Sequence, residues 1–267
     1  MVDGLAQFEA TLHGAKLAGI VLDYDGTIVA TARRFEAIEP AITAELNRLL
    51  DAGLLLGVAT GRGKSVHEKL RAAIAQKHWS RCIVGYYNGG TIRSLEKGCD
   101  GLVDLATDSA IGAAEAALRR APELVGATFD ARPLQITVTR SESDEHGLWM
   151  KVRSILERSK LGALKVVHSS HSVDVVPFHV SKVAVVEHMA QCLGADESAV
   201  LKLGDRGRWP GNDADLLAMS HGLSVDEVSG HPGSCWNLVP LGLTGPAATL
   251  YYLRRVHAGR YNTEALA

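Results

Sequence analysis

The chain has 267 residues, a formal net charge of −2 at pH 7 and a hydrophobic fraction of 46%. It is long enough for one large domain or two modest ones, and its near-neutral charge argues against broad binding to nucleic acid or membranes. The four cysteines show neither close pairing nor metal-ligand spacing, which favours reduced thiols. Asp3 and Glu9 stand where a secretory leader needs a basic start and an apolar core, and no apolar run reaches the roughly 18 residues of a membrane helix. We therefore expect a cytoplasmic protein that does not span a membrane.

Helical spacing over residues 4–16 precedes a short apolar run at 18–22, which predicts a buried strand. The run ends at two carboxylates, Asp23 and Asp25, followed by Gly26. Ligands bind beyond the carboxyl ends of the strands in a parallel sheet, so the two acids are well placed for chemistry. At about 5 Å and an effective dielectric of 20 their repulsion is roughly 3 kcal/mol, which a bound Mg²⁺ would offset. A solvated acidic turn is the alternative, and this stretch alone does not decide between the two.

The next strand also ends in polar residues. Residues 28–39 show no period and are expected to form a loop over the acidic pair, before Pro40 begins a helix. A second apolar strand at 54–59 leads into Thr60-Gly61-Arg62 and a helix over 63–76. A hydroxyl and free N–H groups at a helix start favour a phosphate site, although Thr-Gly is also common turn chemistry. Strand, helix and strand in succession predict a parallel sheet.

The pattern changes after a third strand at 82–87, which ends at Asn88-Gly89-Gly90. Long helical patterns between antiparallel-looking pairs of strands predict an α+β module inserted into a parallel α/β sheet. The helices are expected at 107–120 and 145–159, and the strands near 127–130, 134–139, 163–168 and 172–176. We assign residues 1–88 and 180–267 to the core and residues 89–179 to the insert.

The alternation of strands and helices resumes at Ser181. Lys182 in the first turn of a helix is unfavourable for the helix dipole, so it indicates a carboxylate or phosphate nearby, with a solvated lysine as the alternative. A strand at 200–203 ends at Gly204-Asp205, and Gly211-Asn212-Asp213 begins another helix.

The last predicted helix begins at Pro246. Leu250, Leu253 and Val256 follow helical spacing and are expected to face the core. Three arginines, Arg254, Arg255 and Arg260, are expected on the solvated face.

Together, the four strand ends resemble the motifs of the haloacid dehalogenase superfamily of phosphotransferases. The matching residues are Asp23-Tyr24-Asp25-Gly26-Thr27, Ala59-Thr60-Gly61-Arg62, Ser181-Lys182, and Gly204-Asp205 with Asn212-Asp213. An insert between the second and third motifs resembles the Cof-type branch, which includes sucrose-phosphatase and carries a substrate-specificity cap. The resemblance implies a Rossmann-like parallel-sheet core with an inserted α+β cap. The last motif departs from the family because six residues separate Asp205 from Asn212, more than the family pattern has.

The resemblance also implies a Mg²⁺-dependent phosphatase for a small phosphorylated metabolite, by analogy a sugar phosphate. Asp23 is then the nucleophile that forms an aspartyl-phosphate, and Asp25 is the general acid and base. Thr60 and Lys182 bind the other phosphoryl oxygens. The metal ligands implied are Asp23, Asp25, Asp205, Asn212 and Asp213, and the substrate-binding residues are Gly61, Arg62, Asn88, Gly89, His171 and Arg208.

Some alternatives stay open at this point. The segment from Arg206 to Trp209 is either a substrate contact, because arginine forks bind phosphate and tryptophan stacks on rings, or a surface loop. The spacing of His168, His171 and His179 matches no zinc pattern. His171 and His179 are instead expected to face the cleft and contact substrate hydroxyls. A phosphomutase resembling phosphomannomutase, a polynucleotide-end phosphatase and an accessory binding module are the other functions considered. The sequence distinguishes neither the substrate nor a monomer from a homodimer.

Overall fold

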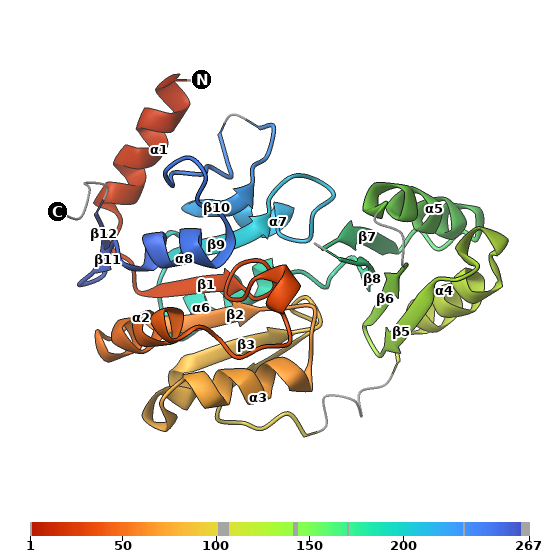
Figure 1. Cartoon of the computed structure of the whole chain (residues 1–267), viewed down its shortest axis with the longest axis horizontal. Coiled ribbons are helices and arrows are strands. Elements are labelled where there is room, and N and C mark those ends of the chain that lie inside the picture. Colours follow the sequence, from red (N-terminus) through yellow and green to blue (C-terminus); the bar gives the residue numbers. More distant parts are fainter. Residues whose placement is uncertain (1, 101–106, 141–143, 170, 232, 263–267) are drawn as a thin grey trace.

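The computed structural model describes residues 2–100, 107–140, 144–169, 171–231 and 233–262. The chain forms two sheets with their own helices (Figure 1). The N- and C-terminal parts of the chain build the larger sheet, and the middle of the chain builds the smaller one. No helix within these described ranges is both long and apolar enough to cross a membrane.

The larger sheet has six strands in the order β10-β9-β1-β2-β3-β4. All neighbouring pairs are parallel except β3 and β4, which are antiparallel. Its strands are β1 (Gly19–Asp23), β2 (Leu55–Ala59), β3 (Cys82–Tyr86), β4 (Thr91–Ser94), β9 (Val200–Arg206) and β10 (Gly222–Glu227). Every residue of β1 and β3 is buried, as expected for parallel strands that helices cover on both faces.

The helices of this core are α1 (Val2–Gly14), α2 (Pro40–Asp51), α3 (Lys64–Ala73), α6 (Val183–Leu193), α7 (Ala214–Leu217) and α8 (Gly245–Leu253). Short 3₁₀ turns are η1 (Thr31–Arg33), η2 (Gln76–Arg81) and η4 (Glu197–Ala199), and a small hairpin pairs β11 (Val256–His257) with β12 (Arg260–Tyr261). The predicted apolar stripe of α2 is buried, with Pro40 in its first turn.

The smaller sheet has four antiparallel strands in the order β5-β6-β8-β7. Its elements are α4 (Ser109–Arg120), η3 (Pro122–Leu124), β5 (Thr128–Arg132), β6 (Gln135–Thr139), α5 (Glu145–Arg158), β7 (Leu164–His168) and β8 (Val173–Pro177). Both long helices cover the face that points away from the larger sheet (Figure 1). The predicted fold class, a parallel α/β sheet with an inserted α+β module, is confirmed.

Side chains alternate across the smaller sheet, as the period of a strand requires. Ile136, Val138 and Val175 pack with the helices in a separate apolar core. Gln135, Thr137 and Asp174 alternate with these apolar residues along β6 and β8, and they line a cavity on the opposite face. The smaller sheet therefore presents a polar wall to the larger one.

Strand β4 has a place that the sequence did not indicate. It follows the Asn88-Gly89-Gly90 turn directly and pairs with β3 in the larger sheet, and the next residue, Leu95, is buried in the larger core. The division into a core (1–88 and 180–267) and a cap (89–179) stays a proposal, and we would now draw its first junction after Leu95.

Two predictions for the C-terminal region are wrong. Helix α8 ends at Leu253, and Val256 lies in strand β11 rather than in the helix. Arg255 is buried, not solvated, because its guanidinium packs over the Tyr251 ring. Arg254 and Arg260 are exposed, as expected.

Candidate active site

Charged side chains from separate elements meet at the carboxyl edge of the larger sheet. Asp23 is the last residue of β1, and Asp205 lies near the end of the neighbouring strand β9. Lys182, which precedes α6, donates from Nζ to Asp23 Oδ1 at 2.6 Å and to Asp213 Oδ1 at 2.7 Å. All four side chains are buried. The sequence predicted a carboxylate or phosphate near Lys182. In the structure, two carboxylates of the protein itself, Asp23 and Asp213, accept from it.

Asp213 is held from two sides despite the lengthened loop before it. Its Oδ1 accepts from Lys182, and its Oδ2 accepts from the backbone N–H groups of Asp205 and Arg206, each at 3.1 Å. A Cβ at Gly204 would lie 2.7 Å from the Asp213 carboxyl carbon, so only glycine permits this approach. Asp213 therefore fixes the position of Lys182 and of the end of β9.

The acids outnumber the cation that compensates them. One carboxylate oxygen from each of Asp23, Asp205 and Asp213 lies within 4.8 Å of the others. Burial raises the pKa of Asp23 to about 7, although Lys182 lowers it, and burial also raises the pKa of Asp205 well above its usual value. An unbalanced buried cluster of oxygen ligands is suited to a divalent cation such as Mg²⁺.

A further oxygen near this cluster supports the same fit. Asn212 lines the adjacent cavity, and in the described part of the chain its buried Oδ1 has no hydrogen-bond partner. A buried carbonyl oxygen without a donor is costly unless an ion or a water satisfies it. The donor set of Asp23, Asp205 and Asn212 therefore fits a hard cation.

Asp25 lies apart from this cluster and has another partner. Arg62 donates from Nη1 to Asp25 Oδ1 at 3.0 Å and to the carbonyl of Arg34 at 2.8 Å. Burial raises the pKa of Asp25, and Arg62 opposes that shift. A carboxyl with a raised pKa keeps its proton to higher pH, which suits a general acid.

Thr60 and the turn after β3 complete the floor of the site. The buried Thr60 hydroxyl accepts from the Arg62 N–H at 3.1 Å, an arrangement that leaves the hydroxyl proton for an anion. Asn88 and Gly89 both have positive φ, and a Cβ at Gly89 would lie 2.2 Å from the Ser181 carbonyl oxygen. Close packing against Ser181 thus explains Gly89 without a substrate contact.

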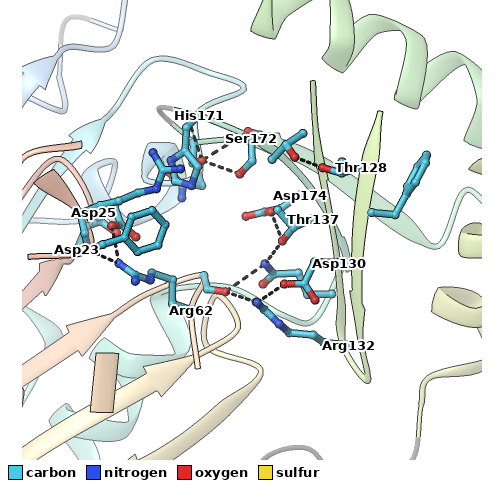
Figure 2. Close-up of a pocket in the computed structure, with 18 residues that line it drawn as sticks. Asp23, Asp25, Arg62, Thr128, Asp130, Arg132, Thr137, His171, Ser172 and Asp174 are labelled. Atoms are coloured by element: carbon cyan, nitrogen blue, oxygen red, sulfur yellow. Dashed lines mark hydrogen bonds and ion pairs between the residues drawn. The ribbon is translucent and has the colours of Figure 1, made fainter. Parts of the chain in front are cut away.

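A cavity of about 330 Å³ separates this charged edge from the smaller sheet. Figure 2 shows Asp23, Asp25 and Arg62 on one side and Thr137, Asp174 and other polar side chains of the smaller sheet facing them. The cavity thus has both carboxylates and guanidinium groups on its core side, and mainly hydroxyl, amide and charged side chains on its opposite wall. This arrangement can hold a phosphoryl group at one end and a polar leaving group at the other.

No family model matches the sequence, and no curated protein matches it. Solved structures do match the fold. A HAD/COF-like hydrolase from Plasmodium vivax is 14% identical with a TM-score of 0.66, covering 92% of this chain and 97% of that one. Trehalose-6-phosphate phosphatase from Aspergillus fumigatus is 16% identical with a TM-score of 0.58, and the match covers 93% of this chain and 96% of that one. Sucrose-phosphatase from Synechocystis is 19% identical with a TM-score of 0.56, and the match covers 79% of this chain and 83% of that one. The chain has the haloacid dehalogenase fold. The resemblance of the motifs is therefore confirmed at the level of the fold.

Within the haloacid dehalogenase fold, the lengthened last motif meets the smaller sheet through its backbone. The N–H of His168, at the end of β7, donates to the Pro210 carbonyl at 3.0 Å, and the His168 carbonyl accepts from the Asn212 N–H at 2.9 Å. Arg208 and Trp209 are exposed and border other surface hollows, not the cavity. The extra residues thus tie the two sheets together, and the predicted contact of Arg208 with substrate has no support in this geometry.

The two histidines expected at the cleft differ. His171 lines the cavity, and burial together with Arg34 and Arg62 lowers its pKa to about 4, so it is neutral at pH 7. His179 is exposed and is not among the residues that line the cavity. Only His171 is placed to meet a ligand there.

Sequence reasoning missed the residues of the smaller sheet that connect the two walls, Arg132, Gln135 and Asp174. Asn88 Nδ2 donates to Gln135 Oε1 at 3.0 Å and to Asp174 Oδ2 at 3.2 Å. The Gly61 carbonyl accepts from Arg132 and Gln135, each at 3.1 Å. The polar positions of the strands expected at 134–139 and 172–176 were the available signal. Two residues predicted to bind substrate, Gly61 and Asn88, therefore also hold the smaller sheet against the site.

Proposed function

We propose that this protein is a Mg²⁺-dependent phosphatase that hydrolyses a small phosphorylated metabolite through an aspartyl-phosphate. The observation that carries the proposal is the buried Asp23 carboxylate, 2.6 Å from Lys182 Nζ and facing a polar cavity. A carboxylate nucleophile, a fixed cation for phosphoryl oxygens and room for a leaving group are the parts that phosphoryl transfer needs.

In the first step the Asp23 carboxylate attacks phosphorus, and the bond from phosphorus to the ester oxygen breaks. Asp25 gives its proton to the leaving oxygen, and its raised pKa, which burial causes, fits that role. In the second step Asp25 takes a proton from a water molecule that attacks phosphorus, which releases phosphate and restores Asp23. Lys182 and Thr60 bind the phosphoryl oxygens throughout.

Asp23, Asp205 and the Asn212 side-chain oxygen would hold Mg²⁺, as their burial and unbalanced charge favour. When bound, the ion neutralises phosphoryl charge and aligns the transfer. Asp213, whose oxygens already accept from Lys182 and two backbone N–H groups, would act by positioning rather than as a ligand.

A sugar phosphate is the substrate class that we favour. The wall opposite the acids carries hydroxyl, amide and carboxyl groups that can pair with sugar hydroxyls. Two proteins of similar fold are named as sucrose-phosphatase and trehalose-6-phosphate phosphatase, which agrees with this choice.

The test is a phosphate-release screen over hexose phosphates, glycerol 3-phosphate, nucleoside monophosphates and oligonucleotide ends, with Mg²⁺ and then with EDTA. We expect release from hexose phosphates that requires Mg²⁺. Isomerised hexose phosphate without free phosphate would instead indicate a phosphomutase. Turnover of oligonucleotide ends alone would exclude a small metabolite, and turnover of none by folded protein would overturn the proposal.

A further inference from the structure

An aromatic ring borders the cavity from the core side. Phe35 follows the 3₁₀ turn η1 in the loop after β1, and its side chain is 72% exposed. It nevertheless lines the cavity together with Asp23 and Asp25. A phenyl ring that stays exposed lacks the roughly 1.5–3 kcal/mol of stabilisation that its burial would give. A ligand that covers the ring would supply this stabilisation.

The backbone that carries this ring is anchored on several sides. Lys69 of α3 donates to the carbonyls of Phe35 and Glu36. The carbonyl of Arg34 accepts from Arg62 at 2.8 Å, and Arg33 forms an ion pair with Glu39. The exposed ring is therefore presented from a fixed loop.

Two guanidinium groups lie over the Phe35 ring. The Arg34 and Arg62 guanidinium carbons are 4.7 Å and 5.3 Å from the ring centroid, and Phe35 as a whole remains 72% exposed. Arg62 also donates to Asp25, the proposed acid that protonates the leaving group. Arg62 thus contacts both the Phe35 ring and the proposed general acid, Asp25.

The other large apolar side chain of the cavity is less available. Among the described residues that line it, only Phe35 and Phe129 carry large apolar side chains. Phe129 packs partly into the apolar core of the smaller sheet and is only partly exposed, whereas Phe35 is exposed. Phe35 is therefore the more exposed of the two rings, and it lies on the core side of the cavity, opposite the polar side chains of the smaller sheet.

We propose that Phe35 is a specificity-determining residue that packs against the apolar C–H face of a cyclic sugar leaving group. A sugar ring has an apolar face and a hydroxylated rim, and Phe35 with the opposite wall matches both. The inference rests on the proposed function and adds to it that the leaving group is a ring recognised in part by the core.

The test compares Phe35→Ala with the wild type on glucose 6-phosphate, which has a ring, and on glycerol 3-phosphate, which has none. We expect kcat/KM for glucose 6-phosphate to fall about tenfold, mainly through KM, because an aromatic contact of about 1.4 kcal/mol is lost. The value for glycerol 3-phosphate should change by less than about twofold. Phe35→Tyr should restore the sugar activity.

A matched control is Phe178→Ala, which removes another exposed phenyl ring outside the cavity; Phe178 is 63% exposed. This variant should leave kcat/KM unchanged for both substrates. An equal loss on both substrates in Phe35→Ala would mean that the ring only positions Arg62 and Asp25, and would overturn the proposal. So would a selective loss on AMP with none on glucose 6-phosphate, or wild-type turnover of glycerol 3-phosphate alone. Turnover of no phosphate ester would instead refute the proposed function itself.

Discussion

The two walls of the cavity are built on different principles. On the core wall, Asp23 and Asp213 share the buried Lys182, and Asp213 accepts two further backbone bonds. On the opposite wall, Asp174 accepts from Thr137 and from Asn88 of the core. The other polar groups of this wall come from β5, from β6 and from Ser169, His171 and Ser172 between β7 and β8. Removing a group from the core wall leaves a buried charge unpaired, which is strongly destabilising. Most polar groups of the opposite wall are hydroxyls and amides, and replacing one of them leaves no charge unpaired. The first wall is therefore constrained by stability as well as by chemistry, and the second is freer to vary with the substrate.

The largest expected effect comes from breaking the core wall at its cation. Lys182→Met keeps length and removes the charge, which leaves Asp23 and Asp213 uncompensated. We expect unfolding free energy to fall by about 3–5 kcal/mol in urea titrations and kcat to fall by about 10²–10³-fold. Lys64→Met, at an exposed ion pair with Glu68, is the control and should change neither. Near-normal activity in Lys182→Met would remove Lys182 from the site.

Magnesium should act on the core wall with a pH dependence set by the acids. Burial raises the pKa of Asp23 to about 7 and raises that of Asp205 well above its usual value, so below about pH 7 the folded, metal-free protein holds a proton on Asp23 that Mg²⁺ must displace. Stabilisation by Mg²⁺ should therefore grow as pH rises from about 5.5 to about 8, towards about 2.7 kcal/mol at a hundred times the Kd. Thermal melts with and without the ion measure it.

The control for this melt is a pair of variants. Asp205→Asn removes a proposed ligand and should abolish the shift, whereas Asp215→Asn, at an exposed acid, should retain it. A shift of equal size at both pH values, or one that survives in Asp205→Asn, would contradict the metal site.

The smallest effect is expected on the opposite wall. Asp174→Asn keeps the size of a buried side chain but replaces an acceptor that Thr137 and Asn88 use. We expect kcat/KM for glucose 6-phosphate to fall about tenfold, while hydrolysis of p-nitrophenyl phosphate, which has no sugar hydroxyls, changes little. Equal losses on both substrates would show that Asp174 supports the fold of the site instead of recognising the leaving group.

The sequence predicted the core wall well because each of its groups follows an apolar strand or opens a helix. Asp23, Thr60, Lys182 and Asp205 could be assigned to one edge from strand order alone. Strand β4 was missed because its residues, Thr91–Ser94, are all only partly buried and show no apolar run. Arg255 was wrongly predicted to be solvated because the sequence does not show that its guanidinium packs over the Tyr251 ring.

The opposite wall was less accessible to the same reasoning. Strands were expected close to β6 and β8, but which of their alternate positions face the site depends on which side α4 and α5 cover. The loop from Arg206 to Gly211 was read through its side chains, whereas its tie to β7 uses the backbone carbonyl of Pro210. Backbone pairing of that kind has no residue signature.

The central claim is that Asp23 carries the phosphoryl group, and trapping that intermediate tests it most directly. p-Nitrophenyl phosphate has a leaving group that needs no proton, so the Asp25→Asn variant should form the aspartyl-phosphate and hydrolyse it slowly. Reduction with borotritide converts an aspartyl-phosphate to labelled homoserine, which mass spectrometry can locate in the tryptic peptide 17–33. We expect homoserine at position 23, only when substrate is present. Label at another residue, or phosphate release from this variant with no label at Asp23, would contradict the account.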